Sequence, residues 1–202
     1  GNLTIKAGRS VLVNANITTD NGNLTLKANE TNANGAVNQR DSGAAAITLA
    51  SGTTINVGTG VFTASMDTGA GKTNTNSGDI TLSNVTAGSL VVNNGGNTSG
   101  SDILDNGVLT IAGTSSFTTS VSNADITLDS ANAFTGAVTL NTSGSTGNAT
   151  IDNGTTALNI AASSVGGNLT LTSGAAAGIT DSGTLTVGGN LVATTDANNG
   201  LI

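Results

Sequence analysis

The chain is built from short runs in which apolar residues alternate with small or polar ones. The clearest run is Gly167-Asn168-Leu169-Thr170-Leu171-Thr172-Ser173. It opens the chain as Gly1-Asn2-Leu3-Thr4-Ile5-Lys6-Ala7 and returns as Gly22-Asn23-Leu24-Thr25-Leu26-Lys27-Ala28. Looser copies begin at Ala46, Asp79, Val108, Asp125, Ala137, Asn148, Ala157 and Thr184. Alternation with a period of two, bounded by Gly, Asn and Asp, predicts β-strands with one buried face.

The two apolar residues of each phrase are expected to point inward, and the Thr between them outward. The expected inward core ladder consists of Leu3, Ile5, Leu24, Leu26, Ile47, Leu49, Ile80, Leu82, Leu109, Ile111, Ile126, Leu128, Leu169 and Leu171. The expected outward threonine ladder consists of Thr4, Thr25, Thr48, Thr81, Thr110, Thr127, Thr139, Thr150, Thr170 and Thr186.

The spacing of the phrases predicts an all-β parallel β-helix, or β-solenoid. The interval from Leu3 to Leu24 is nearly the same as the interval from Leu24 to Ile47. A coil of about 20 residues with two to three short strands, repeated about ten times, accounts for this spacing. From Ile80 onward the closer phrases predict two strands per coil. We expect a single solenoid over 1–202, with loop insertions near 29–42 and 67–77, where polar residues interrupt the rhythm.

Two other fold classes compete with the solenoid. A helical fold is disfavoured because no window repeats apolar residues with helical spacing and Gly, Asn and Thr fill the gaps. An antiparallel sandwich also suits short strands at this spacing. Near-identical phrases favour the solenoid, because stacked coils place like residues on like.

The composition limits the kind of core that the chain can form and the classes of partner that it can bind. The chain has 29 Gly, 1% aromatic residues and no Pro, Cys, Trp, Tyr or His, so we expect a narrow aliphatic core without disulfides. The formal net charge is −7, and no Lys or Arg follows Lys72. Nucleic-acid binding and attraction to anionic lipid both require a basic footprint that this chain lacks. Isolated Asp residues are interpreted as turn residues that serve solubility and local hydrogen bonds.

No motif predicts catalysis, a metal site or a cofactor. The nearest carboxylate pairs for glycoside chemistry are Asp102 with Asp105 and Asp125 with Asp129, without the aromatic residues that bind sugars. The run 69–73 resembles the end of a phosphate-binding loop, but Met66 stands where that motif needs Gly. Gly-Gly-Asn at 95–97 and 188–190 lacks the rest of a calcium repeat. We therefore expect that the protein is not an enzyme.

Asn-x-Ser/Thr sequons are frequent in this Asn- and Thr-rich chain. Asn29 and Asn97 are the two expected to be most accessible to a glycosyltransferase, because both fall in predicted loops.

The Gly-Asn-Leu-Thr-Leu/Ile-x-Ala phrases, together with the short and regular coil and the absence of Cys and Trp, resemble the filamentous haemagglutinin family. The members are large exoproteins of Gram-negative bacteria, exported by two-partner secretion. The resemblance covers the whole chain and implies a right-handed parallel β-helical shaft, a secreted or cell-surface location, and a role in adhesion or surface coating. This sequence departs from the family pattern because the Asn-Pro-Asn signatures of the family's amino-terminal secretion domain cannot occur without Pro, so we expect it to be an internal segment.

The expected function is therefore a structural shaft segment of an adhesin or extracellular fibre. The alternatives are ice or surface binding through a flat threonine-rich face, and a subunit of a self-assembling filament. Expected partners are further coils of the same polypeptide, identical subunits end to end, or the surface of a host or neighbouring cell. Because a strand phrase stands at Gly1 and another near Ile202, we expect the chain to be part of a longer repeat protein.

Overall fold

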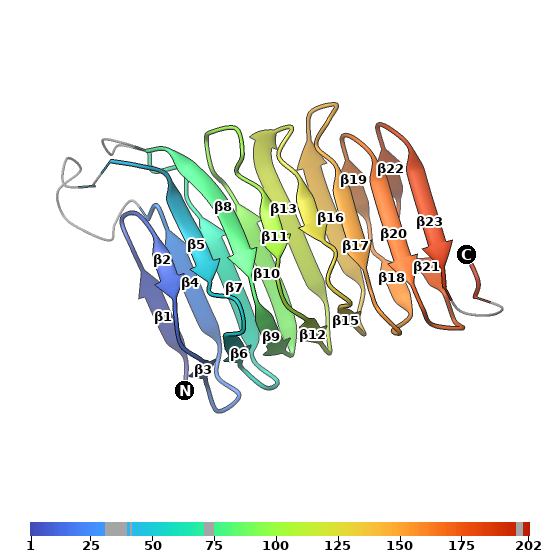
Figure 1. Cartoon of the computed structure of the whole chain (residues 1–202), viewed down its shortest axis with the longest axis horizontal. Coiled ribbons are helices and arrows are strands. Elements are labelled where there is room, and N and C mark those ends of the chain that lie inside the picture. Colours follow the sequence, from blue (N-terminus) through green and yellow to red (C-terminus); the bar gives the residue numbers. More distant parts are fainter. Residues whose placement is uncertain (31–39, 41, 71–74, 197–199) are drawn as a thin grey trace.

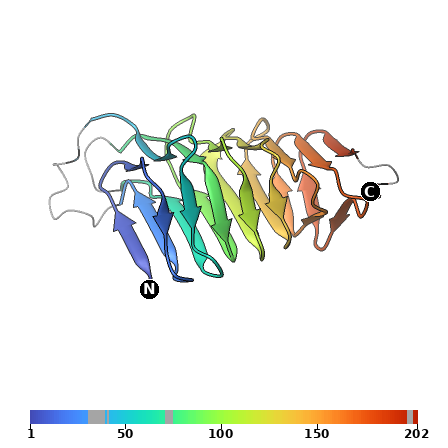
Figure 2. The ribbon, with the colours of Figure 1, turned by 60° about the horizontal axis from the view of Figure 1, so that its bottom comes forward.

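The computed structural model describes residues 1–30, 40, 42–70, 75–196 and 200–202. The described residues form β-strands, turns and loops without a helix, and the strand pairs among them are parallel. The strands stack along one long axis, with the two termini at opposite ends (Figures 1 and 2). This confirms the parallel β-solenoid.

The strands belong to three sheets. The first sheet has ten strands: β1 (Leu3–Lys6), β4 (Leu24–Ala28), β7 (Val61–Met66), β10 (Ser89–Asn94), β13 (Ser115–Ser122), β16 (Val138–Ser143), β18 (Leu158–Ile160), β21 (Ile179–Asp181), β19 (Ser163–Val165) and β22 (Leu185–Val187). The second has eight: β2 (Val11–Val13), β5 (Ala45–Leu49), β8 (Ser77–Leu82), β11 (Ile103–Asp105), β14 (Ile126–Leu128), β17 (Ala149–Asp152), β20 (Leu169–Ser173) and β23 (Leu191–Thr195). The third has five: β15 (Ala133–Phe134), β12 (Leu109–Ile111), β9 (Asn84–Ala87), β6 (Thr54–Asn56) and β3 (Ile17–Thr18).

Each coil contributes one strand to each side of the solenoid. From β1 to β15 the strands recur in the order first, second, third sheet. In the later coils β18 and β21 come third along the chain, but the pair Val138–Ile160 joins β18 to the first sheet. The described residues therefore form seven coils of three strands and an eighth with β22 and β23. Three strands per coil correct the expectation of two after Ile80, and eight coils correct the expectation of ten.

The strand register gives the length of a coil directly. Ile80, Ile103 and Ile126 are successive partners in the second sheet. The residues just before them, Asp79, Asp102 and Asp125, follow one another at intervals of 23 residues, which is the length of these coils.

The coil that begins with β4 is longer. Leu24 pairs with Phe62, and the preceding residues Asn23 and Val61 are 38 residues apart, because a polar insertion follows β4. The expected insertions at 29–42 and 67–77 both lie between the first and second sheets, and 31–39, 41 and 71–74 are outside the described residues.

Alternating burial explains why the phrases form these strands. In β4 and β20 every second residue is buried, and the Thr residues between them are partly exposed. The core is mostly aliphatic, with three fully buried Phe side chains. Phe117 and Phe134 meet edge to face, with ring centroids 5.8 Å apart and an interplanar angle of 81°.

A row of glycines lets neighbouring coils approach at the corner that precedes the first sheet. A Cβ at Gly22 would lie 2.0 Å from the carbonyl oxygen of Gly1, and one at Gly60 would lie 2.6 Å from that of Gly22. No side chain fits at those distances, so the Gly at these positions is required by the stacking itself.

Candidate functional site

Most residues of the expected core ladder are buried. The twelve from Leu24 to Leu171 are at most 2% exposed, whereas Leu3 is 40% exposed and Ile5 is half-buried, because both lie in the first coil. The twelve residues do not form one ladder. Leu24 stacks on Phe62 in the first sheet, Ile47 on Ile80 in the second, and Leu109 on Val85 in the third.

The expected threonine ladder is likewise divided among the three sheets. The outward row on the second sheet runs Leu12, Thr48, Thr81, Leu104, Thr127, Thr150, Thr170 and Val192. Each strand contributes one residue to this row, and Leu104 interrupts the threonines. The expectation of a single threonine face is therefore wrong, because the threonines are distributed over rows on three different sheets.

Asp and Asn side chains form a second ladder at the corner that precedes the second sheet. The ladder consists of Asp79, Asp102, Asp125, Asn148, Asn168 and Asn190 and is called the corner ladder here. The Oδ1 atom of each member accepts a hydrogen bond from the backbone N–H of the next, at 3.0, 2.8, 2.7, 2.9 and 2.8 Å along the series. Each side chain therefore links its own coil to the following one.

The corner ladder corrects our interpretation of the Asp residues. These side chains were expected to make local turn hydrogen bonds, but Asp102 and Asp125 bond to backbone groups 23 residues away. The Asn of the opening phrases acts in the same way, since Asn2 accepts from the N–H of Asn23 at 2.9 Å. The sequence signal for this role was the recurrence of Asp or Asn immediately before a strand phrase.

The candidate carboxylate pairs are rearranged by the fold. Asp102 neighbours Asp125 in the corner ladder, whereas Asp105 is the last residue of β11 and faces inward like Ile103. The Asp105 carboxylate is buried and accepts hydrogen bonds from Asn132 Nδ2 at 2.7 Å and from the N–H of Ser130 at 3.2 Å. Burial raises the pKa of Asp105, and the negative charge of Asp129 adds to this effect.

Asp79, the first member of the corner ladder, also has a raised pKa. Burial is the main cause, and the charge of Asp102 acts in the same direction, against the hydrogen bond from the Asp102 N–H. The carboxylates of the corner ladder thus hold the coils together. Within the described residues, no group of three or more His, Cys, Asp or Glu side chains is placed to bind a metal.

These raised pKa values predict that mild acid stabilises the protein. The folded state takes up protons at Asp79 and Asp105 at a higher pH than the unfolded state does, so the unfolding free energy increases as pH falls from 7. The gain ends near pH ~4, where the unfolded carboxylates also protonate. Urea titrations at pH 7, 6 and 5 measure the effect. The Asp79→Asn/Asp105→Asn variant should show a smaller gain, and an equal gain in both proteins would contradict the assignment.

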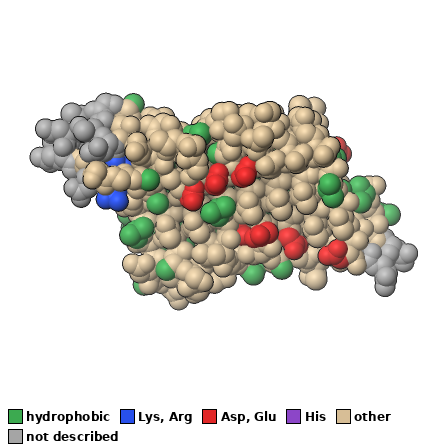
Figure 3. Space-filling model, turned by 45° about the horizontal axis from the view of Figure 1, so that its top comes forward, with side chains coloured by type: hydrophobic (Ala, Val, Ile, Leu, Met, Phe, Trp, Pro, Cys, Tyr) green, Lys and Arg blue, Asp and Glu red, His purple; other side chains and the backbone are tan. Residues whose placement is uncertain are grey.

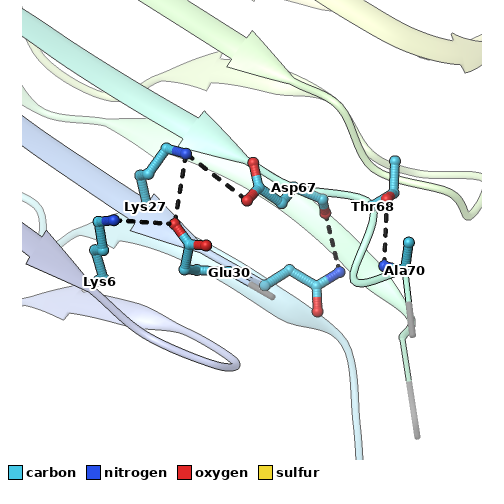
Figure 4. Close-up of polar contacts among 7 residues, drawn as sticks. Lys6, Lys27, Glu30, Asp67, Thr68 and Ala70 are labelled. Atoms are coloured by element: carbon cyan, nitrogen blue, oxygen red, sulfur yellow. Dashed lines mark hydrogen bonds and ion pairs between the residues drawn. The ribbon is translucent and has the colours of Figure 1, made fainter. Parts of the chain in front are cut away.

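Among the residues that the structure describes, the cations lie where the polar insertions leave the solenoid. Lys6 and Lys27 both pair with Glu30 Oε2, at 3.6 and 3.4 Å, and Lys27 also lies 3.8 Å from Asp67 Oδ2 (Figure 4). The Glu30 side chain is 3% exposed. The face shown in Figure 3 carries Lys and Arg at this end only, with acidic side chains further along.

Arg40 is buried beside the same insertion. It donates hydrogen bonds to the carbonyl oxygens of Gly8, Gly43 and Asn76 at 3.1, 3.2 and 2.8 Å. Burial, followed by the charge of Arg9, lowers the pKa of Arg40. Lys6, Lys27 and Arg40 therefore support the base of the insertions.

The two residues expected to be glycosylated differ in their exposure to solvent. Asn29 is fully buried, has a φ of 54° and donates through Nδ2 to the carbonyl oxygens of Asp67 and Thr75, so its predicted accessibility is wrong for the folded chain. Asn97 is more accessible, but its Nδ2 donates to the Thr68 carbonyl and to Thr75 Oγ1. Glycosylation at Asn97 stays a prediction. Of the phosphate-loop-like run 69–73, only Gly69 and Ala70 lie within the described residues.

A family model described as repeats of unknown function, DUF5649, matches residues 68–141 and 146–202, which is more than half of the chain. The chain belongs to this family. The first matched stretch of the DUF5649 chain ends within β16, the second begins before β17, and each spans more than one coil of the solenoid. No curated protein and no solved structure matches the chain. Among its described residues there is no helix of the length and apolar character needed to cross a membrane.

Proposed function

We propose that this DUF5649 chain is a structural shaft segment of a secreted or cell-surface adhesin or extracellular fibre, without catalytic activity. The observation that carries the proposal is the corner ladder, in which carboxylate and amide groups bond one coil to the next. A protein that uses its polar side chains to bond its own coils together is suited to act as a rod-like spacer. Its resemblance to filamentous haemagglutinins supports the same function.

The ion pairs and buried Arg40 support this proposal from the amino-terminal part of the molecule. Lys6, Lys27 and Glu30 fix the base of an insertion into the shaft. Surface loops on a rigid scaffold are where repeat proteins commonly carry their contacts. The proposed partners are further coils of the same polypeptide or identical subunits along the axis, and the surface of a host or neighbouring cell at the loops.

Two measurements on the organism that makes the protein test this proposal. An antibody raised against the chain should label intact Gram-negative cells or the culture medium, and labelling only after permeabilisation would contradict it. An immunoblot of the undigested polypeptide distinguishes a segment of a long adhesin from a subunit of a self-assembling fibre. A mass far above 19.3 kDa indicates a long adhesin shaft, and a mass near that value indicates a self-assembling fibre.

A further inference from the structure

The tripeptide Asp-Asn-Gly occurs three times in the chain, as Asp20-Asn21-Gly22, Asp105-Asn106-Gly107 and Asp152-Asn153-Gly154. An Asn side chain that precedes Gly is open to attack by the next backbone nitrogen, because Gly has no Cβ to shield that atom. The three copies share the residues around the reacting bond. A difference in reactivity among them in the folded chain would therefore come from tertiary structure.

The copy at Asn153 is held on every polar atom that the reaction would use. The side chain is fully buried, and its Oδ1 accepts a hydrogen bond from the N–H of Phe134 at 2.7 Å. Its Nδ2 donates to the carbonyl oxygens of Phe134 and Ala157 at 3.1 and 2.9 Å. The N–H of Gly154, which would be the attacking group, donates to Asp152 Oδ1 at 2.8 Å. Asn153 can react only after these bonds open.

The copy at Asn21 is exposed but fixed in position. Its Oδ1 accepts hydrogen bonds from the N–H and the Oγ1 of Thr59, at 3.0 and 3.3 Å. These two bonds hold the side chain against a loop that lies 38 residues further along the chain. Rotation of the Asn21 side chain toward the nitrogen of Gly22 would break both of them.

The copy at Asn106 lies in the turn between β11 and β12, midway along the solenoid (Figure 1). Asn106 is exposed, and its side chain makes no hydrogen bond within the described part of the chain. The backbone is anchored on either side, because the N–H of Asn106 donates to the Leu82 carbonyl at 2.9 Å and the N–H of Val108 donates to Asn84 Oδ1 at 3.1 Å. Between these anchors the N–H of Gly107 has no hydrogen-bond partner among the described residues. Both reacting groups are therefore available in the folded chain.

The stacking of the coils keeps Gly at position 107. A Cβ there would lie 2.9 Å from the backbone nitrogen of Asn84 and 2.9 Å from its Oδ1, in the preceding coil. Real Cβ atoms do not approach backbone atoms so closely, so a larger residue at this position would push the two coils apart. The close approach that stacks the coils thus also leaves the Asn106 side chain beside an unshielded nitrogen.

We propose that Asn106–Gly107 is a site of spontaneous deamidation, at which the folded chain modifies itself with water as the only co-reactant. The nitrogen of Gly107 attacks Asn106 Cγ, and the bond between Cγ and Nδ2 breaks. Ammonia leaves with the proton of the Gly107 N–H, and a cyclic imide remains. Water then opens the ring at one of its two carbonyl carbons and returns a proton to the nitrogen.

The two ring openings give different products. Breaking the bond to Cγ leaves Asp at position 106, whereas breaking the bond to the backbone carbonyl carbon leaves isoaspartate. Both products add a carboxylate next to Asp105. Isoaspartate also adds one carbon to the backbone between β11 and β12, just before the Val108 N–H that bonds to the preceding coil. The modification would therefore act on the stacking of the coils at this turn.

Peptide mapping by mass spectrometry tests the proposal on the purified 202-residue chain after incubation at neutral pH, below its unfolding temperature. The protease must not require Lys or Arg, since neither follows Lys72. Deamidation should accumulate at Asn106 at least about tenfold faster than at Asn153, and faster than at Asn21, because a protected Asn reacts only through local opening. The product should contain isoaspartate, which isoaspartyl methyltransferase detects, because direct hydrolysis of the amide yields Asp alone.

Two controls separate tertiary structure from local sequence. Incubation in guanidinium chloride removes the fold, and the three Asp-Asn-Gly copies should then deamidate at similar rates. Asn106→Gln places the amide one carbon further from the nitrogen of Gly107, so the folded variant should stay unmodified at position 106. Far-UV circular dichroism checks that this variant folds.

Three results would overturn the proposal. They are a rate at Asn106 in the folded chain no higher than at Asn153, a product without isoaspartate, and the same order of rates in denaturant as in the folded chain. Cell labelling tests the proposed function separately and does not depend on this result.

Discussion

The Ile126→Asp variant is expected to lose most of its folding stability. Ile126 is fully buried in the second sheet between Ile103 and Ala149, and an Asp there would place a carboxylate in an aliphatic core. Burying an unpaired charge costs several kcal/mol, compared with a total unfolding free energy of about 5 to 15 kcal/mol for a typical domain. Thermal unfolding followed by circular dichroism should show a much lower midpoint or no cooperative transition.

The matched control for this variant is Thr127→Asp. Thr127 is the next residue of the same strand and points outward, so its substitution should change the unfolding free energy by no more than about 0.5 kcal/mol. Equal losses in the two variants would contradict the assignment of Ile126 to the inward face.

The second large effect is expected at the aromatic pair. Phe117→Ala should lower the unfolding free energy by about 3 to 5 kcal/mol, because it leaves a cavity and removes the edge-to-face contact with Phe134. Urea denaturation of Phe117→Ala, Phe134→Ala and the double variant measures the coupling, which should be about 0.5 to 1.5 kcal/mol.

Phe62 provides the control for this cycle. It is also fully buried, but its partners in the first sheet are Leu24 and Leu90 rather than an aromatic ring. Phe62→Ala and Phe134→Ala should therefore have additive effects. Coupling of the same size in both cycles would show that the loss comes from general packing and not from the Phe117–Phe134 contact.

The insertions into the shaft could be located from the sequence, but their anchoring could not. The polar runs near 29–42 and 67–77 stood out because they interrupt the strand rhythm. Burial of Asn29, Glu30 and Arg40 at the base of these insertions was not visible in that pattern. Polar residues in a polar run look exposed until their partners are known, and those partners lie in other parts of the chain.

Strands without the repeated phrase were also missed. β10 reads Ser-Leu-Val-Val-Asn-Asn and β13 reads Ser-Ser-Phe-Thr-Thr-Ser-Val-Ser, and both belong to the first sheet. Without them the coils after Ile80 seemed to contain two strands. Stacking on β7 and β16 stabilises these segments as strands, so their conformation depends on contacts with other coils.

The sequence by itself determined the strand character of the chain and the inward and outward faces of each phrase. It could do so because a period of two is a local property that one strand expresses alone. Only the tertiary structure decided which of three sheets each phrase joins, and which backbone group each Asp or Asn accepts from. Those outcomes depend on the length of every turn between strands and on contacts between residues a full coil apart, which no local pattern records.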